Sequence, residues 1–461
     1  MKYLLLLLSF FLSLPLFSQD YKNCGDVLLK YQLEKKYPGV TKLVDETFKE
    51  AKNSSSTRMD VLRIPIVFHV VYNNDDQNIS DEVLIEQINV LNEDFRRMNA
   101  NASETRDTFI NIAADAEIEF FLAGEDPDGN PSSGITRTFT DLSSFISLSF
   151  ADILEAFAEC GSDISDPDVA ACLEEFFAGA NAIDLDLMKS NETGGKDAWD
   201  TNRYLNIWVV NLGLDVMGGD PIPFILGFAY PPMEAPNWPA DIFPEELEKK
   251  DGVVLHYQTV GRNNPTAGPL VGTNDEGRTC VHEIGHYLGL RHIWGDGDCS
   301  MDDGILDTPT AGSESQATVD ISGCGDFHDK DSCTDDDLPD MIENYMDYSS
   351  ERCQNMFTAE QVTLMRAMLE GPRSGLLDNQ ISSIDEISDQ FVVFPNPSSG
   401  NISIVTDRDI DLLINVYNAA GKLVYQTSEL EFDIPTKESG VFFIEISGEN
   451  QSTFKKIIVN K

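Results

Sequence analysis

A short run of histidines, a glutamate and a glycine carries the residue types needed to bind a metal ion and activate water. In a helix, His282 and His286 lie one turn apart on the same face, so both imidazoles can reach one ion. Glu283 is rotated by about 100° from His282, where its carboxylate can approach a metal-bound water. Gly289 lets the helix end in a left-handed conformation, and the turned chain brings back His292 as a third ligand. Three imidazoles with an open position predict a catalytic zinc site with Glu283 as its base.

Three of the six histidines in the chain fall in this motif. Two histidines with this spacing occur by chance on amphipathic helices, but the added glycine and third histidine argue against a chance match. The motif resembles the long zinc signature of the metzincin metalloproteases. The other histidines are interpreted as structural or surface residues, and these are His69, His256 and His328.

A second motif, Asn-Tyr-Met-Asp-Tyr at 344–348, is similar to the Met-turn of the pappalysin family of metzincins. The resemblance implies that Met346 forms an apolar floor beneath the imidazoles and that Tyr348 hydrogen-bonds the oxyanion developing on the substrate. Similar stretches occur at Asp307–Pro309, Asp331–Cys333 and Phe357–Thr358. We therefore expect residues 63–375 to form an α+β, metzincin-like protease domain with a twisted mixed sheet, an active-site helix and a loop-rich lower half.

The composition limits the classes of partner. The 461 residues are enough for two or three domains with globular cores. Asp and Glu total 79 against 32 Lys and Arg, which gives a formal net charge of −47. This charge argues against nucleic acids or anionic membranes as partners, because both would be repelled.

The N-terminus reads as a signal peptide over residues 1–18, with an apolar run from Leu4 to Phe17 and cleavage expected after Ser18. No other run reaches membrane-spanning length. We therefore expect a secreted or cell-surface protein, exported through the periplasm, whose cysteines can form disulfides.

Residues 19–62 are polar and have the composition of a removable pro-segment. Within it, Cys24 could occupy the open zinc position as a thiolate, as the cysteine switch of related zymogens does. The carboxylate of Asp26 could do the same. The alternatives for Cys24 are a disulfide with Cys280 or an idle thiol.

The elements that position the motif follow from hydrophobic periodicity. Arg63–Tyr72 is an apolar, β-rich run and predicts a buried strand, while Ser80–Phe95 predicts a helix with Ser80 as its N-cap. Further strands are expected at Ile118–Leu122, from Thr136, at Tyr204–Asn211, at Gly227–Tyr230 and at Gly252–Tyr257. We expect Gly227–Tyr230 to be an edge strand that can hold an extended peptide by main-chain hydrogen bonds. A final helix is expected over Phe357–Glu370.

Residues 141–190 interrupt this order and are interpreted as an insertion. Phe150–Phe157 and Val169–Ala178 have helical patterns, and Cys160 and Cys172 are close enough in sequence to pair. A structural helical hairpin is favoured over a lid or an exosite. The family resemblance implies two more disulfides, Cys299 with Cys333 and Cys324 with Cys353.

Clustered Asp and Gly after the zinc motif supply hard oxygen ligands suited to Ca²⁺. The resemblance implies a structural calcium here, and the candidate ligands are Asp296, Asp298, Asp302, Asp303 and Asp307. Arg352 stands where, in relatives specific for basic residues, an acidic residue is thought to select Arg or Lys at the first primed position. The reversed charge of Arg352 would favour acidic or neutral residues there.

Residues 376–390 form a polar linker, and residues 391–461 alternate short strands with turns, which predicts a small β-sandwich. Phe-Pro-Asn-Pro at 394–397, with the glycines and lysines that follow, resembles the C-terminal sorting domain of the type IX secretion system of Bacteroidetes. The alternative is a substrate-binding β-module.

Together these features predict a secreted zinc endopeptidase that acts on proteins or peptides and is exported by the type IX machinery. Two alternatives remain. One is a non-catalytic, calcium- or zinc-stabilised binding protein or adhesin on the same fold, and the other is a zinc hydrolase with a substrate other than protein.

Overall fold

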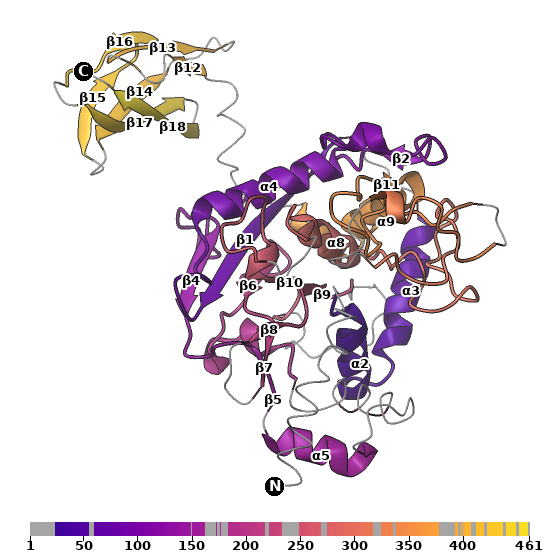
Figure 1. Ribbon diagram of the computed structural model, residues 1–461. Helices are drawn as coiled ribbons and strands as arrows, with labels where there is room; N and C mark the ends of the chain where they lie inside the picture. Colours follow the sequence, from indigo (N-terminus) through magenta and orange to yellow (C-terminus); the bar gives the residue numbers. More distant parts are fainter. Residues whose placement is uncertain are drawn as a thin grey trace. The chain divides into compact units, whose positions relative to one another are not determined.

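The structure is a computed structural model (Figure 1) that divides into two units, Met1–Gln380 and Ile381–Lys461. The described residues are 24–54, 60–148, 150–161, 172, 176, 183–216, 221–232, 249–268, 274–316, 324–334, 338–377, 392–394, 398, 400–406, 412–418, 422–436, 439–448 and 451–459. The expected signal peptide, most of the expected helix at 169–178 and most of the expected linker lie outside these residues. None of the described helices is long and apolar enough to cross a membrane.

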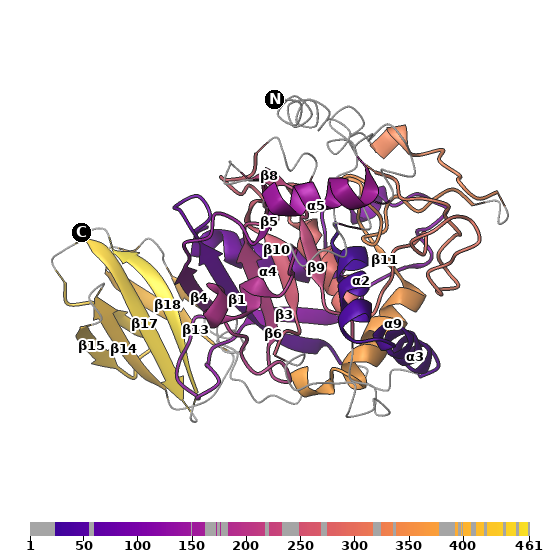
Figure 2. The same cartoon turned by 90° about the horizontal axis from the view of Figure 1, so that it is seen from below.

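Two helices form the described part of the expected pro-segment, α2 (Asp26–Lys36) and α3 (Val40–Lys52). Between them Gly39 has φ +94°, and the carboxylate of Glu34 accepts hydrogen bonds from the backbone N–H of Gly39 and Thr41 at 2.7 and 3.0 Å. Figure 2 shows α2 beside the edge strand β9 and α3 beside α9, in agreement with their contacts.

The first unit is built on a six-stranded sheet in which β9 is antiparallel and the other pairings are parallel. The order is β3–β1–β6–β10–β9, and β4 also pairs with β1. The strands are β1 (Leu62–Tyr72), β3 (Ile118–Leu122), β4 (Ile135–Phe139), β6 (Leu205–Val210), β9 (Gly227–Ala229) and β10 (Val253–His256). The expected central and edge strands are therefore β6 and β9.

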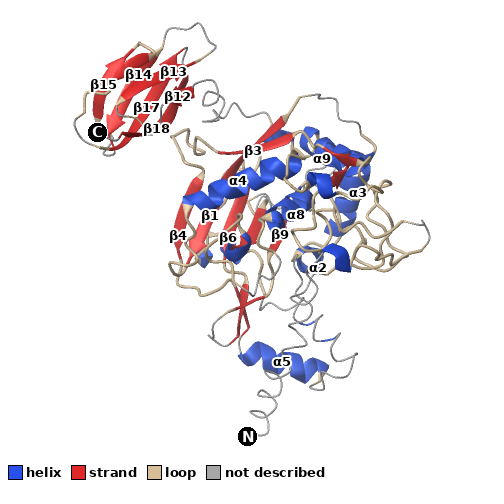
Figure 3. Ribbon diagram, turned by 45° about the horizontal axis from the view of Figure 1, so that its top comes forward, coloured by secondary structure: helices blue, strands red, loops and turns tan. Residues whose placement is uncertain are grey.

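The sheet separates two apolar cores because its central strands are buried on both faces. Alternate residues of β1, from Ile64 to Val70, join the larger core, together with α4 (Asp81–Phe95) and α8 (Arg278–Tyr287). Figure 3 shows α4 and α8 on the same side of the strands. Trp208 and Phe228 join the second core on the opposite face.

A small sheet of β5 (Ile146–Leu148), β7 (Gly213–Val216) and β8 (Ile222–Pro223) links the expected insertion to the end of β6. The insertion also contains α5 (Phe150–Cys160), where the sequence predicts a helix. Short 3-10 helices lie at Ala102–Glu104, Leu187–Lys189, Asn191–Thr193, Tyr257–Thr259, Cys324–Asp326 and Ser374–Leu376.

Below the sheet, the chain is rich in loops up to α9 (Ala359–Glu370). This helix was expected to begin at Phe357, but Phe357 and Thr358 form β11, which pairs with β2 (Ala113–Ala114). The Thr358 side chain accepts from the backbone N–H of Gln361 in a capping box, so the helix begins after it. Three disulfides occur among the described residues, Cys160–Cys172, Cys299–Cys333 and Cys324–Cys353.

The second unit has two antiparallel sheets around one apolar core, which confirms the expected small all-β domain. One sheet has β12 (Val392–Phe394), β13 (Asn401–Val405) and β16 (Glu431–Asp433). The other has β14 (Leu413–Asn418), β15 (Leu423–Thr427), β17 (Gly440–Gly448) and β18 (Gln451–Val459). Alternate residues of these strands, such as Ile402, Ile414 and Ile444, are buried in the core.

Candidate zinc centre

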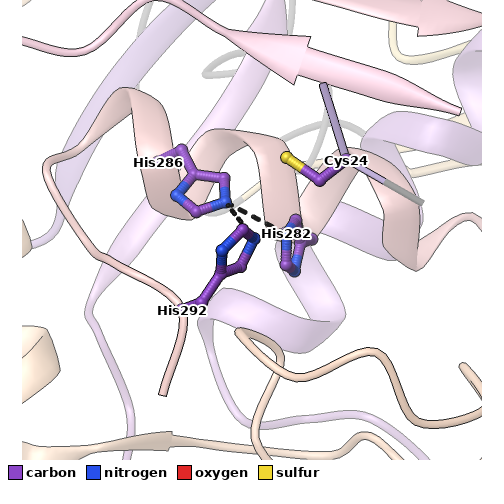
Figure 4. A group of neighbouring side chains, drawn as sticks. All are labelled: Cys24, His282, His286 and His292. Atoms are coloured by element: carbon purple, nitrogen blue, oxygen red, sulfur yellow. Dashed lines mark hydrogen bonds between the residues drawn. The ribbon is translucent and has the colours of Figure 1, made fainter. Parts of the chain in front are cut away.

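The three histidines of the sequence motif converge on one point (Figure 4). His286 Nε2 lies 3.1 Å from His282 Nε2 and 3.1 Å from His292 Nε2. All three side chains are buried, and the ligand atoms of this cluster lie within 4.8 Å of one another, with the sulfur of Cys24 as the fourth member. Among the described residues this is the one group of three or more His, Cys, Asp or Glu that could hold a metal ion.

The other nitrogen of each ring has a fixed oxygen partner. His282 Nδ1 lies 2.7 Å from the carbonyl oxygen of Tyr345, and His286 Nδ1 lies 2.9 Å from that of Leu290. His292 Nδ1 bonds Asp296 Oδ1. Because these oxygens accept hydrogen bonds, each Nδ1 donates, and a neutral ring then presents the lone pair of Nε2 to the centre. Burial lowers the pKa of His282 well below its usual range and that of His286 to about 4.

This donor set fits zinc. The Nε2 lone pair of His286 faces those of His282 and His292 at 3.1 Å each, and such lone pairs repel unless a cation lies between them. With Zn–N distances of about 2.0–2.1 Å, a tetrahedral ion separates its ligand nitrogens by about 3.3–3.4 Å, close to the observed spacing.

The turn after α8 brings His292 to the site. Gly289 has φ +90°, and the backbone N–H of Leu290 donates to the carbonyl of Gly285 at 2.9 Å, which ends the helix in a Schellman-type turn. A Cβ on Gly289 would also lie 2.6 Å from Met368 Cε. The motif glycine is therefore required both for its left-handed backbone and for close packing.

Met346 lies directly against the ligand helix. A Cβ on Gly285, between the first two histidines, would lie only 2.4 Å from Met346 Sδ. Met346 is fully buried. The thioether therefore packs against the helix turn that carries His282 and His286.

Glu283 is buried between α8 and the edge strand. A Cβ on Gly227 of β9 would lie 2.8 Å from Glu283 Cγ, so the strand passes the carboxylate closely. Glu283 Oε1 has no hydrogen-bond partner among the described residues. Burial, followed by the nearby carboxylate of Asp26, raises the pKa of Glu283 well above its usual range.

Cys24 enters the site from the pro-segment. Its Sγ donates to Glu283 Oε2 at 3.5 Å, and Cys24 forms a parallel bridge with Gly227. Cys24 and Cys280 are both free and buried, so the disulfide considered between them is not formed.

Tyr348 borders the histidines. Its ring centroid lies 5.7 Å from that of His282 and 5.0 Å from that of His292. The ring of Trp294 stacks on His292 at 4.3 Å and makes an edge contact with Tyr348 at 4.8 Å. This aromatic group packs against the imidazole of His292.

Arg352 lies at the surface, where its Nη2 bonds Asp275 at 2.9 Å and its Nε lies 3.7 Å from Glu276. The preceding residue, Glu351, is buried and accepts from the backbone N–H groups of Glu276 and Thr279 at 2.7 and 2.6 Å. Glu351 therefore stabilises the N-terminal turn of the ligand helix.

The candidate calcium carboxylates have separate partners. Asp298 accepts from Ser300, Asp302 from the N–H of Gly304, Asp303 from Ile305 and Thr308, and Asp307 from Thr358 and the N–H of Glu360. Asp296 has φ +59°, which turns its carboxylate back to His292. Asp296 was expected only as a calcium candidate, and no sequence pattern indicates its contact with His292.

Two further residues that matter to the site, Lys30 and Arg373, were not expected from sequence. Lys30 Nζ bonds Asp26 Oδ2 at 2.7 Å and Asp296 Oδ2 at 3.3 Å, which ties α2 to the carboxylate behind His292. Arg373, after α9, donates from Nε to the carbonyl of Tyr287 at 2.8 Å and pairs with Asp251. Arg373 thereby holds the C-terminal end of α8.

The fold and the three-histidine centre define a metzincin-type metalloprotease domain, and comparisons with known proteins agree. Residues 270–370 match the protein family described as pregnancy-associated plasma protein-A, peptidase family M43. Residues 392–460 match the secretion system C-terminal sorting domain, which marks the chain for export by the type IX secretion system of Bacteroidetes.

Among solved structures, promirolysin of Tannerella forsythia, studied as a point mutant, is 36% identical, with a TM-score of 0.56 and coverage of 77% of this chain and 97% of that one. Mature mirolysin in complex with a cleaved peptide is 39% identical, with a TM-score of 0.51 and coverage of 70% and 97%. An extracellular metalloprotease of Arthroderma gypseum is 37% identical over 147 residues, 31% of this chain and 43% of that protein. The chain spans about half the length of the curated relatives it matches.

The chain belongs to the M43 pappalysin family of zinc metalloproteases. Membership of this family and the histidine cluster imply a zinc ion.

Proposed function

We propose that this chain is a secreted, zinc-dependent endopeptidase that is held latent by its own pro-segment. The observation that carries the proposal is the convergence of three imidazoles, with His286 Nε2 3.1 Å from the Nε2 atoms of His282 and His292, beside the buried carboxylate of Glu283. His282, His286 and His292 would hold the zinc, and Cys24 would occupy its fourth position in the zymogen. When bound, the zinc supplies a Lewis acid that polarises the scissile carbonyl and lowers the pKa of a water molecule.

Glu283 is the proposed general base and acid. Its Oε1 has no partner among the described residues, so this oxygen is available to take a proton from the attacking water and return it to the leaving amine. The proposed role of Tyr348 is to donate its hydroxyl hydrogen to the developing oxyanion, since its ring borders those of His282 and His292. Met346 would hold the ligand helix from below.

The proposed substrate is an extended segment of a protein or peptide, held on the edge strand β9. This strand pairs on one side with β10, and on its other side Gly227 meets the pro-segment, with the backbone N–H of Gly25 donating to the carbonyl of Gly227 at 2.8 Å. A substrate would take over this main-chain bond once the pro-segment is removed.

Latency follows from the same contacts. As a zinc-bound thiolate, Cys24 would displace the catalytic water from the metal, and its sulfur, 3.5 Å from Glu283 Oε2, would stand where that water must meet the base. Cys24 pairs with Gly227 in parallel, whereas an antiparallel peptide forms the more stable pairing. A pro-segment that runs opposite to a substrate would present no scissile bond in the productive direction.

The finer assignments are proposed as follows. The boundaries are a pro-segment over residues 19–62, a catalytic domain over 63–375 and a sorting domain over 391–461 that engages the type IX machinery. A structural calcium would bind among the acidic loops after His292. Arg352 would disfavour basic residues at the first primed position. Its ion pairs with Asp275 and Glu276 partly offset its positive charge.

The test is to incubate the matured protein with a mixed peptide library, with and without a zinc chelator, and to read the products by mass spectrometry. Chelator-sensitive internal cleavage supports the endopeptidase, and the residues after each cut report on Arg352. An absence of cleavage, with zinc bound and the pro-segment gone, would instead favour a binding protein on the same fold.

A further inference from the structure

Helix α2 packs its apolar face against the protease unit. Its residues Leu29 and Leu33, one helical turn apart, are 2% and 4% exposed. They belong to one apolar cluster with residues from both ends of the insertion and from the segment before β9, namely Phe145, Ile146, Ile183, Leu185 and Ile225. We call these five residues the α2 groove. The insertion therefore builds a surface that the pro-segment covers.

The α2 groove is continuous with the proposed active site. Cys24 is at the zinc centre, Gly25 bonds Gly227, and α2 begins at the next residue, Asp26. A Cβ on Gly25 would lie 3.0 Å from Ile225 Cγ2, so the chain enters the groove directly from the edge strand. A ligand that extends from the centre past β9 would reach the same apolar side chains.

Acidic groups at the rim match basic groups on α2. Lys30 bonds Asp296 at 3.3 Å at one end, and Lys36 lies 3.9 Å from Asp186 at the other, where Lys250 also pairs with Asp186 at 2.7 Å. Between them Gln32 Nε2 donates to the carbonyl of Ile183 at 2.5 Å. The groove thus suits an amphipathic segment with apolar residues at i and i+4 and flanking cations, and the net charge of −47 favours the same kind of partner.

We propose that, after removal of the pro-segment, the α2 groove becomes a docking site for a cationic amphipathic segment of the substrate, outside the cleavage site itself. This inference builds on the proposed endopeptidase function. Removal of α2 would leave an apolar patch in water next to the cleft, and such patches commonly mark binding sites. The helix that fills the groove in the zymogen is the template for what replaces it.

The direction in which the substrate runs along β9 determines on which side of its scissile bond the docked segment lies. The pro-segment meets β9 in parallel, and α2 follows Cys24 in sequence. A substrate paired antiparallel to β9 runs the opposite way, so the residues that precede its scissile bond lie on the α2 side. The docked segment is therefore N-terminal to the bond that is cut.

The test uses the matured full protein and three fluorogenic peptides that share one cleavable sequence found in the library experiment. The first carries an N-terminal segment with Leu at i and i+4 flanked by Lys. The second has both Leu replaced by Gln, and the third carries the Leu/Lys segment on the C-terminal side. We expect kcat/KM for the first peptide to exceed that for the other two by about tenfold or more, mainly through KM, because two leucines are buried.

A matched variant and a binding assay complete the design. The substitution Ile183→Ser should move the ratio of the first to the second peptide towards one. Separately, a labelled peptide of residues 26–36 should bind the matured protein in fluorescence anisotropy, and a Leu29→Ser, Leu33→Ser version should bind at least about tenfold more weakly.

The outcomes separate the two proposals. Equal cleavage of all three peptides overturns the docking site while the endopeptidase stands, and a preference for the third overturns the direction. If no peptide is cut, the endopeptidase proposal fails, and the anisotropy assay then decides whether the α2 groove is a docking site. Leucine-dependent binding then supports the docking site, and its absence overturns it.

Discussion

The Sγ of Cys24 lies 3.5 Å from Oε2 of Glu283, so one pro-segment side chain reaches both the proposed metal position and the proposed base. These residues are separated by 259 positions in the sequence. We therefore propose that latency and catalysis depend on the same small region around Cys24 and Glu283.

The proposed roles of Glu283 as base and His286 as metal ligand should be distinguishable by substitution. Glu283→Gln in the matured protein should keep stoichiometric zinc and lose about 10²–10⁴-fold in kcat/KM, because it removes the base and no ligand. His286→Ala should lose both zinc and activity. Metal analysis and peptide cleavage on the same samples give the answer, and an active Glu283→Gln protein would remove Glu283 from the mechanism.

The two free cysteines, Cys24 and Cys280, allow the proposed cysteine switch to be tested with a matched control substitution. In the unprocessed protein, Cys24→Ala should permit cleavage of a short peptide, whereas Cys280→Ala should stay latent because Cys280 lies in the core of the ligand helix. Initial rates should be measured while mass spectrometry confirms an intact chain. Equal latency of both variants would show that Cys24 is not the switch.

Gly285 should not tolerate a methyl group. A Cβ there would lie 2.4 Å from Met346 Sδ, so Gly285→Ala should lower the free energy of unfolding by about 1–3 kcal/mol and weaken zinc binding. Adding Met346→Ala should recover part of both losses by making room. Denaturant unfolding and a zinc competition assay measure these effects, and the absence of recovery would argue against a direct clash.

Asn substitutions at Asp296 and Asp298 should distinguish a carboxylate that orients a zinc ligand from one that merely belongs to the acidic loop. Because Asp296 accepts from His292 Nδ1, Asp296→Asn should weaken zinc binding by about 10–100-fold. Among the described residues the Asp298 carboxylate bonds Ser300, away from the histidines, so Asp298→Asn should leave zinc affinity unchanged. Competition with a chelator of known affinity tests the pair, and equal affinities would contradict the orienting role.

Asp303 should make stability depend on pH. Burial raises its pKa from 3.8 to about 7. A raised folded-state pKa gives stability that is complete below about pH 4 and is lost as pH rises to about 7. Asp303→Asn stays neutral, so above pH 7 it should be the more stable protein, by up to about 4 kcal/mol.

Urea unfolding of wild type and Asp303→Asn at several pH values, with and without a calcium chelator, tests this expectation. If the variant is instead less stable at pH 8, and the chelator destabilises only wild type, Asp303 belongs to a calcium site.

Local sequence patterns predicted the parts of the fold that local physics determines. The continuous apolar, β-rich run in β1 and the 3.6-residue period in α4 predicted a buried strand and a helix, and the structure confirms both. The spacing of the histidines and Gly289 implied that their side chains meet, because helix geometry and one left-handed residue leave little freedom.

Contacts between distant segments could not be read in the same way. The sequence around Asp296 resembles a calcium loop, and only its positive φ directs the carboxylate to His292. Lys30 contacts Asp296 across 266 positions, and no local pattern encodes that pairing. Which of Glu351 and Arg352 faces inward also depends on the path of the loop, and the structure buries Glu351.

Arg373 defines how far the catalytic unit extends. Its guanidinium holds the last turn of α8 through the carbonyl of Tyr287 and lies 3.4 Å over the tyrosine ring, and the nearby Leu376 is buried. We therefore expect any maturation step that trims the sorting tail to cut beyond these residues. A cut before Arg373 would loosen the helix that carries two of the three histidines, so the shortest active form should retain both Arg373 and Leu376 and end within the proposed linker rather than at its start.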